Sequence, residues 1–275
     1  MQRLTLNNGT SIPQVGFGVW PLTDEQAYTA VTHALHAGYR HIDTARAYRN
    51  EAGVGRAVRD SAIPRREVFL TTKLWNADQG YESTLRAFDT SLRLLGTDYL
   101  DLYLIHWPAP EHDLYVTSYK ALERIYAEGR ARAIGVSNFT AATLDRLLAE
   151  TGVVPALNQI ELHPYLPQRR MRALAAERSI ATEAWSPLAQ GGALLGEPVL
   201  TSLAEKYGKS PAQIVLRWHL QLGNVVIPRS VTPARIAENI DVLDLTLTPE
   251  EVHAITALDT GTRLGPDPAV FNRRA

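Results

Sequence analysis

The stretch GYRHIDTARAYRNE, residues 38–51, passes from an apolar run directly into polar and charged residues. The apolar run ends at Ile42, and a helical pattern begins at Glu51. A strand followed closely by a helix start is typical of a βα unit. The carboxylate of Asp43 follows the strand at once, and the phenol of Tyr48 comes five residues later. An acid and a phenol at the mouth of a strand require an explanation.

The same βα unit recurs along the chain. β-rich runs are expected at residues 15–20, 39–42, 68–72, 99–105, 131–136, 156–161, 180–185 and 225–228. Helical patterns lie between them at 24–37, 51–59, 81–95, 118–128, 141–150, 168–178 and 211–221. Strands alternating with helices predict a parallel sheet, and eight strands are the number that closes a (β/α)₈ barrel.

The two ends of the chain fall outside this rhythm. LTLNNGTSIP alternates around an Asn-Gly turn and predicts an N-terminal β-hairpin. The tail from about Leu245 is polar and is expected to cap one face as a C-terminal loop. The sequence therefore predicts one α/β domain over residues 1–275, a TIM barrel preceded by a hairpin.

Composition restricts the classes of function. The chain has 275 residues, 45% of them apolar, a net charge of −1 and no cysteine. The charge balance offers no basic field for nucleic acid or an anionic membrane, and the missing thiols exclude disulfides and a cysteine nucleophile. The start lacks a signal-peptide core and no apolar run reaches membrane-span length, so a cytoplasmic protein is expected.

Three glycine-containing segments of the chain do not fit known phosphate-binding motifs. GFGVWP at residues 16–21 places Pro21 where a dinucleotide fold needs its third glycine, and GVGRAV at 53–58 follows no strand. GKS at 208–210 lacks the upstream glycine of a P-loop, and Pro211 makes Ser210 a plain helix N-cap. A doubly wound nucleotide-binding fold is therefore not supported.

Polar residues gather at the carboxyl ends of the expected strands, where barrels carry their chemistry. In chain order these residues are Asp43, Lys73, His106, Ser137, Asn138, Gln159, Trp185, Ser186, Arg229 and Ser230. Each has an ordinary reading by itself, such as a helix cap for Asp43 or a solvent-directed side chain for Lys73. Several such coincidences on consecutive strands favour one site. The remaining histidines form no set of metal ligands.

Asp43, Tyr48, Lys73 and His106 make chemical sense together. A phenol has an ordinary pKa of roughly 10, and a nearby ammonium lowers it. Lys73 is expected to supply that ammonium, and Asp43 to keep it charged and aimed. His106 would donate a hydrogen bond to a substrate oxygen. A proton donor and a hydrogen-bond donor that both face the oxygen of a substrate carbonyl suit carbonyl reduction. Side chains cannot supply the hydride that this reaction needs, so a nicotinamide cofactor must bring it.

The second half of the chain offers groups for such a cofactor. Ser137, Asn138 and Gln159 suit a carboxamide, and the ring of Trp185 suits stacking on a flat heterocycle. Arg229, Ser230 and Arg235 lie beside an expected helix start and suit a phosphate; the alternative is an ordinary polar loop. Two arginines at an adenosine end favour a 2′-phosphate, hence NADPH over NADH.

Several segments resemble known sequences. GYRHIDTARAYRNEAGVG, RARAIGVSNF and IPRSVTPARIAEN resemble the three signature segments of the aldo-keto reductases. FLTTKLWNADQGYESTLRAFDTSLRLLG followed by DYLDLYLIHWP is similar to the bacterial branch that includes 2,5-diketo-D-gluconate reductases. The resemblance covers essentially the whole chain. It implies a monomeric (β/α)₈ barrel that uses NADPH to reduce aldehydes and ketones.

The resemblance also implies roles for residues. It implies a catalytic tetrad of Asp43, Tyr48, Lys73 and His106, and cofactor contacts from Ser137, Asn138, Gln159, Trp185, Ser186, Leu188, Arg229, Ser230, Val231, Arg235, Glu238 and Asn239. Its substrate cleft would be walled by Trp20, Trp75, Trp107 and Phe271. Arg229 departs from the family, which commonly has lysine there, and an arginine contacts phosphate through a planar fork.

Two other functions remain open from sequence. One is an NADPH-binding, redox-sensing barrel with little turnover, and the other is a Schiff-base lyase with Lys73 as the covalent residue. A lyase needs a neutral lysine, whereas Asp43 would keep this one charged. Candidate substrates of a reductase are keto-sugar acids such as 2,5-diketo-D-gluconate, methylglyoxal, keto esters and aromatic aldehydes.

Overall fold

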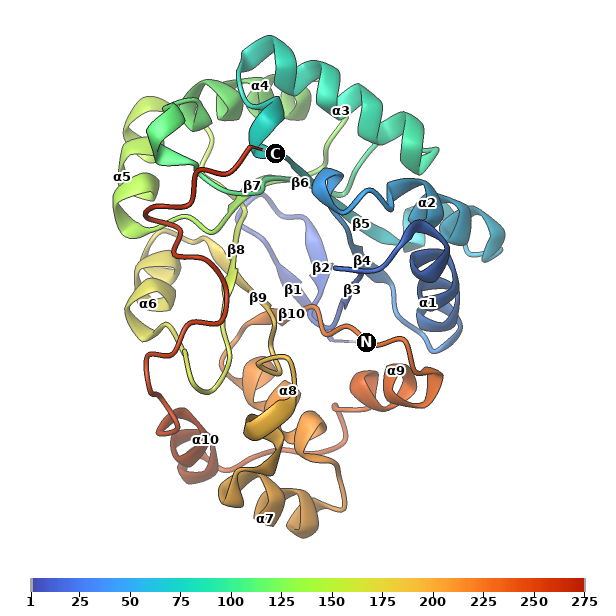
Figure 1. Cartoon of the computed structure of the whole chain (residues 1–275), viewed down its shortest axis with the longest axis vertical. Coiled ribbons are helices and arrows are strands. Elements are labelled where there is room, and N and C mark those ends of the chain that lie inside the picture. The colour runs from blue at the N-terminus through green and yellow to red at the C-terminus, as the bar shows by residue number, and fades with distance from the viewer. Residues whose placement is uncertain (1, 275) are drawn as a thin grey trace.

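The computed structural model, which describes residues 2–274, contains a parallel barrel of eight strands (Figure 1). The strands follow chain order around the barrel: β3 (Phe17–Gly18), β4 (His41–Asp43), β5 (Phe69–Leu74), β6 (Leu102–Ile105), β7 (Ile134–Ser137), β8 (Leu157–Glu161), β9 (Ala181–Trp185) and β10 (Val225–Val226). The ring closes where Val15 bridges Val226, with the Gly16 amide donating to the Val226 carbonyl at 2.8 Å. The predicted (β/α)₈ barrel is confirmed.

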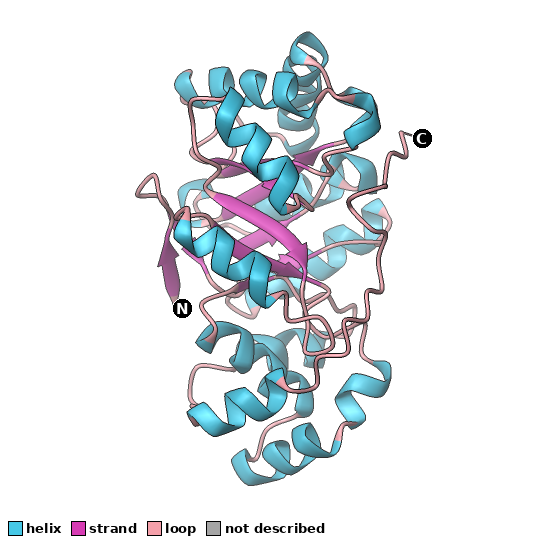
Figure 2. Ribbon diagram, turned by 90° about the vertical axis from the view of Figure 1, so that its left-hand side faces the viewer, coloured by secondary structure: helices cyan, strands magenta, loops and turns pink. Residues whose placement is uncertain are grey.

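Helices surround the barrel (Figures 1 and 2). They are α1 (Asp24–His36), α2 (Glu51–Asp60), α3 (Tyr81–Leu95), α4 (Tyr115–Ala127), α5 (Ala141–Glu150), α6 (Arg169–Glu177), α7 (Pro198–Tyr207), α8 (Pro211–Gln221), α9 (Pro233–Ile240) and α10 (Pro249–Thr256). The expected helices at 24–37 and 211–221 begin at Thr23 and Ser210, which are N-caps closed by capping boxes, and Gly96 ends α3 in a left-handed conformation. Within residues 2–274, no helix is long and apolar enough to cross a membrane.

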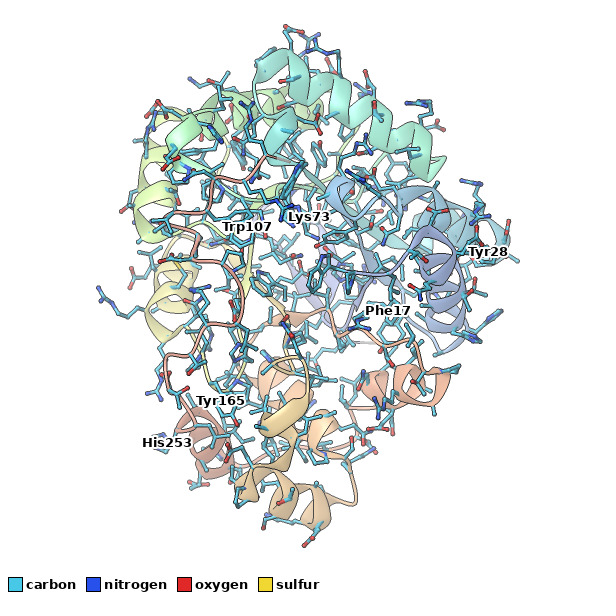
Figure 3. The ribbon with its side chains drawn as sticks, viewed as in Figure 1. Phe17, Tyr28, Lys73, Trp107, Tyr165 and His253 are labelled. Atoms are coloured by element: carbon cyan, nitrogen blue, oxygen red, sulfur yellow. The ribbon has the colours of Figure 1, made fainter. Side chains whose placement is uncertain are left out.

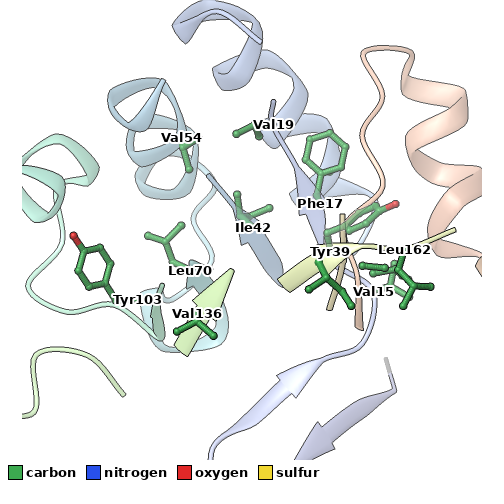
Figure 4. Close-up of a cluster of buried hydrophobic side chains, with 14 of the residues drawn as sticks. Val15, Phe17, Val19, Tyr39, Ile42, Val54, Leu70, Tyr103, Val136 and Leu162 are labelled. Atoms are coloured by element: carbon green, nitrogen blue, oxygen red, sulfur yellow. The ribbon is translucent and has the colours of Figure 1, made fainter. Parts of the chain in front are cut away.

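Strand side chains alternate between two cores. Ile42, Leu70, Tyr103 and Val136 pack outward, in the layer between the sheet and the helices (Figure 4). Their neighbours in the strands turn toward the barrel interior, where Leu102, Leu104 and Leu157 form an apolar lower layer. Because the strand period is two, His41 and Asp43 share the inward face, as do Phe69, Thr71 and Lys73.

The two ends of the chain close opposite ends of the barrel. The hairpin of β1 (Arg3–Thr5) and β2 (Ser11–Pro13) packs Leu6 and Ile12 against the apolar lower layer. Figure 2 shows this hairpin on one side and the C-terminal segment on the other. The C-terminal segment therefore runs on the side where the strands end.

The expectation that the tail from about Leu245 is only a loop is wrong. Leu245, Leu247 and Ile255 are buried, and Ile255 belongs to α10, which precedes the final loop. Its start was readable in the sequence, because Thr248 and Glu251 form a capping box around Pro249. Helix α7 was not among the expected helices, and only the start of α9 was expected, although each begins with a proline.

Two glycines allow neighbouring helices to touch. A Cβ on Gly55 of α2 would meet the Leu95 carbonyl oxygen at 2.2 Å, and one on Gly53 would meet the Asp24 carbonyl oxygen at 2.1 Å. Backbone atoms cannot move aside as a flexible side chain does. The close contacts of α2 with α1 and α3 therefore require glycine, which has no side chain, at these two positions.

We expect Gly55→Ala to lower the free energy of unfolding by about 1–3 kcal/mol, the usual cost of overpacking. Urea denaturation with circular dichroism measures it. Gly196→Ala is the matched control, because a Cβ there meets no atom within 4 Å and the residue lacks a positive φ. Equal stability of the two variants would contradict the proposed helix contact.

Candidate active site

A buried ion pair lies at the centre of the carboxyl end of the barrel. Lys73 of β5 and Asp43 of β4 are both inaccessible to solvent, and the Lys73 Nζ lies 2.5 Å from Asp43 Oδ1. The same ammonium donates to the Thr44 carbonyl at 2.9 Å and to the Tyr48 hydroxyl at 3.5 Å. Burial has the largest single effect and lowers the pKa of Lys73, but the charge and hydrogen bond of Asp43, together with the neighbouring Tyr48 and Glu183, outweigh burial and the net pKa is raised. Lys73 is therefore a cation.

Tyr48 lies on a short 3₁₀ turn, η1 (Arg46–Tyr48), directly after β4. Its ring centre is 5.1 Å from the Lys73 ammonium. The expectation that Lys73 brings the pKa of Tyr48 below its ordinary value is wrong for this structure. Burial raises that pKa, and the attraction of Lys73 only offsets part of the rise. Tyr48 is thus protonated at neutral pH, with a cation beside it that favours its ionised form.

His106 follows β6 and lies among aromatic rings. Its ring centre is 5.5 Å from that of Tyr48 and 5.3 Å from that of Trp75. Burial and the Lys73 charge lower the pKa of His106 well below its usual value, so the imidazole is neutral. A neutral imidazole offers one N–H to a substrate oxygen.

The four residues of the expected tetrad are thus brought together around the Tyr48 hydroxyl. Figure 3 shows Lys73 and Trp107 near the middle of the barrel in the axial view. The geometry argues against Lys73 as a Schiff-base nucleophile, because that role needs a neutral amine.

The amide and hydroxyl groups of β7 and β8 form one connected set. The Ser137 hydroxyl donates to the Gln159 carbonyl at 2.9 Å, and Asn138 Nδ2 donates to Ser137 Oγ and to the His106 carbonyl. Asn138 adopts a left-handed φ of 63° and accepts from Trp185 Nε1 at 2.8 Å. Trp185 is therefore held in place by the side chain of the neighbouring strand end.

Sequence reasoning missed two buried carboxyl groups near this set. Gln159 Nε2 donates both to Asp43 Oδ2 at 2.9 Å and to Glu183 Oε2 at 2.8 Å. Glu161, at the end of β8, accepts from the backbone amides of Leu264 and Gly265. The sequence signal for both is the period-two alternation of a strand. In LNQIE it places Glu161 on the same face as Gln159, and in ATEAW it places Glu183 on the same face as Trp185.

The expected phosphate residues lie around the start of α9. Arg229, Val231 and Arg235 are exposed, and neither arginine has a carboxylate partner among the described residues. Thr232 is the N-cap but makes no side-chain capping bond. Ser230 is buried and accepts from the Thr232 amide at 3.1 Å. The start of α9 thus combines two arginines that lack a carboxylate partner among the described residues with backbone amides that no side chain caps.

Other members of the cofactor set differ in their surroundings. Ser186 and Leu188 are half-buried and lie in a turn after β9, in which the Ala189 amide donates to the Ser186 carbonyl at 2.9 Å. Glu238 is engaged with the Ser210 hydroxyl, the N-cap of α8. Asn239 is buried beside it on the same helix.

The expected substrate side is aromatic and includes the C-terminal segment. Phe271 packs on Trp107 with ring centres 4.4 Å apart, and Trp75 Nε1 donates to the Arg274 carbonyl at 2.9 Å. His112 Nε2 contacts the Asn272 carbonyl at 2.8 Å. Trp20 is 56% exposed and makes no ring contact with these residues among those described. Three of the four expected wall residues are thus tied to the tail or to His106.

No group of three or more His, Asp or Glu side chains that could hold a metal occurs in residues 2–274. A surface hollow of about 680 Å³ lies at the opposite end of the barrel and is lined by Arg3, Arg40, Arg66 and Arg132 together with Asp101. None of the expected site residues lines it.

Comparison with known proteins agrees with this geometry. Residues 8–260 match the model of the Aldo/keto reductase family. An aldo-keto reductase of Mycolicibacterium smegmatis is 59% identical over 98% of both chains, and the methylglyoxal reductase DkgA of Escherichia coli K12 is 52% identical over 98% of this chain and 97% of the other. The crystal structure of a Gox0644 mutant in complex with NADPH has a TM-score of 0.93 at 46% identity, covering 98% of this chain and 97% of that one. The chain belongs to the aldo/keto reductase family.

Proposed function

We propose that this protein reduces small aldehydes and ketones to alcohols, with NADPH as the reductant. The observation that carries the proposal is the Lys73 ammonium, which lies 2.5 Å from the Asp43 carboxylate and 3.5 Å from the Tyr48 hydroxyl. A protonated phenol beside a fixed cation is suited to giving its proton to a carbonyl oxygen.

The residues present fit a phosphorylated dinucleotide. Arg229 and Arg235 carry charges that no carboxylate of the described chain neutralises, and the start of α9 leaves its amides uncapped. Trp185 offers an indole held by Asn138, and Gln159 has both Nε2 hydrogens engaged, which leaves Oε1 for a further partner. We infer that the 2′-phosphate is held by Arg229, Ser230, Val231 and Arg235, and that the nicotinamide stacks on Trp185. The carboxamide would lie near Ser137, Asn138 and Gln159. The pyrophosphate would lie along Ser186 and Leu188, and the adenine near Glu238 and Asn239.

When bound, NADPH supplies the hydride that a carbonyl carbon accepts. Tyr48 gives its proton to the carbonyl oxygen, and the neutral imidazole of His106 donates a hydrogen bond to the same atom. The phenolate that remains on Tyr48 faces the Lys73 ammonium, which stabilises it. Asp43 keeps Lys73 charged while the proton moves. The raised pKa of Tyr48 means that the acid is present in its protonated form throughout the neutral range.

The substrate class we infer is that of small carbonyl compounds, including α-oxoaldehydes. The support is the aromatic character of Trp75, Trp107 and Phe271 beside His106, and the 52% identity to a methylglyoxal reductase. We further propose a monomeric, cytoplasmic protein, as the family resemblance implies; sedimentation and cell fractionation test these two points.

The experiment that tests the function is consumption of NADPH by the purified protein across a panel of methylglyoxal, keto-sugar acids, keto esters and aromatic aldehydes, repeated with NADH. Turnover of at least one carbonyl class with NADPH is expected. Binding of NADPH, seen as quenched protein fluorescence, without turnover of any compound would instead favour a redox-sensing barrel.

Tyr48→Phe should lower kcat for the best carbonyl by about 10²–10⁴-fold, the usual contribution of a positioned proton donor. The variant should still bind NADPH with nearly unchanged Kd, because the phenol oxygen is not among the expected cofactor contacts. Steady-state kinetics and fluorescence titration give the two values. A variant with wild-type kcat would remove Tyr48 from the acid role.

Arg235→Ala should raise the Kd for NADPH by about 10- to 100-fold, the loss of one charge-assisted contact, and should leave the Kd for NADH nearly unchanged. Arg66→Ala is the matched control, since Arg66 is exposed and lines the hollow at the other end of the barrel. Equal weakening of both cofactors would show that Arg235 does not read a 2′-phosphate.

A further inference from the structure

Glu183 is a fully buried carboxyl group that the proposed reaction does not use. It lies on β9, two residues before Trp185, and its strand register places it beside Gln159 of β8. Gln159 Nε2 donates one hydrogen to Glu183 Oε2 and the other to Asp43 Oδ2, so one amide joins two carboxyl groups. Glu183 is therefore connected to Lys73 through Gln159 and Asp43.

The second oxygen of Glu183 faces His41. Glu183 Oε1 has no hydrogen-bond partner among the described residues and lies 3.6 Å from His41 Nε2. His41 Nδ1 lies 3.3 Å from the Pro13 carbonyl, which only accepts, so the ring hydrogen is on Nδ1. Burial lowers the pKa of His41 to about 3, so Nε2 carries a lone pair and not a second hydrogen. The Thr71 hydroxyl also lies 3.4 Å from Nε2 and can share this lone pair with a carboxylic acid hydroxyl of Glu183, whereas a carboxylate oxygen facing the lone pair would be repelled.

The charges around Glu183 lead to the same state. The strands around Glu183 present the following side chains to the barrel interior: His41 and Asp43 from β4, Thr71 and Lys73 from β5, and Gln159 from β8. The residues of β10 that pair with β9 are both valines. Lys73 is the single cation of this set, and Asp43 already binds it at 2.5 Å. Burial and the negative charge of Asp43 raise the pKa of Glu183 to about 8.

We propose that Glu183 is a positioning residue that acts as a neutral carboxylic acid, holding the Gln159 amide toward Asp43 and leaving Asp43 as the one negative charge paired with Lys73. The inference rests on the proposed reductase function and adds to it. The acid takes the second Nε2 hydrogen of Gln159 without adding charge to the barrel interior. Its ionisation places a second anion near the site, which makes the Tyr48 phenolate less favourable.

The consequence is a pH dependence with a definite origin. Below pH of about 8 Glu183 is protonated and Tyr48 is the stronger acid; above it Glu183 is ionised and Tyr48 gives its proton less readily. Tyr48 itself has a pKa raised above 10, so its own loss of the proton falls at higher pH. An alkaline decline of the reductive rate near pH 8 that Glu183→Gln abolishes would therefore belong to Glu183, whereas a decline that the variant keeps would belong to the phenol.

Two measurements test the proposal. In the cofactor-free protein, infrared spectra with ¹³C-labelled glutamate should show a carboxylic acid band that disappears near pH 8 in the wild type and is absent in Glu183→Gln. In single-turnover reduction of a carbonyl that the wild type accepts, the wild-type rate should fall by on the order of tenfold through this range, as one unit of phenol pKa allows. Glu183→Gln should keep the neutral-pH rate within about twofold and lose the decline, because its amide reproduces the neutral acid.

Glu51→Gln is the matched control. Glu51 is equally buried and also has a pKa raised by burial, but it accepts from Thr72 on the outer face of β5 and does not contact Gln159. This variant should retain the wild-type pH profile. A Glu183 that is ionised at pH 6 in the infrared titration, or a Glu183→Gln variant with the wild-type decline, would overturn the proposal. Because the titration needs no cofactor, it separates this outcome from a failure of the proposed function, which would show as no turnover at any pH.

Discussion

The buried ion pair between Lys73 and Asp43 is the contact on which the rest of the site depends. Removing two charges from water costs several kcal/mol per ion unless geometry and hydrogen bonds compensate. Here all three ammonium hydrogens of Lys73 have acceptors, on Asp43, Thr44 and Tyr48. Asp43 in turn accepts from Gln159 through its second oxygen. The pair is therefore satisfied within the protein, and its cation is aimed at the one phenol nearby.

The barrel separates an apolar half from a polar half by strand alternation. Leu102, Leu104 and Leu157 fill the lower layer beneath the hairpin, where no polar partner is required. Higher on the same inward faces stand polar side chains, and Asp43, Gln159 and Glu183 are joined by hydrogen bonds across strands. Asp43 and Glu183 lie in this polar half in different environments: Asp43 touches the ammonium, whereas Glu183 faces a neutral imidazole and an amide. Such a difference is what divides a pair of acids into one charged and one neutral member.

The C-terminal segment completes the carboxyl end from far along the chain. Glu161 receives the Leu264 and Gly265 amides, and a Cβ on Gly265 would lie 2.4 Å from the Trp185 ring. Further on, Phe271 packs on Trp107 and the Arg274 carbonyl accepts from Trp75. The tail thus touches side chains of both the expected cofactor half and the expected substrate half. The position of the C-terminal segment therefore depends on the absence of a side chain at Gly265 and on the aromatic contact of Phe271.

The sequence by itself determined the barrel and the residues at the strand ends. Each βα unit is a local signal, in which period-two apolar runs, caps and turn glycines act within a few residues, and the carboxyl ends of parallel strands must share one end of a closed sheet. Asp43, Tyr48, Lys73 and His106 could be read in this way. The start of α10 was also present, in the capping box of Thr248 and Glu251, but the polar tail concealed it.

Only the tertiary structure decided the protonation states and the long-range contacts. Whether burial or Lys73 controls the pKa of Tyr48 depends on how much water the assembled barrel excludes, and burial prevails. The bridge from Asp43 through Gln159 to Glu183 joins β4 to β8 and β9 from the other half of the chain, and no local pattern encodes which side chains meet inside a closed sheet. The reason is physical: residue types and their spacing fix what the strands present, whereas distance and desolvation, which set charge, exist only after the barrel has closed.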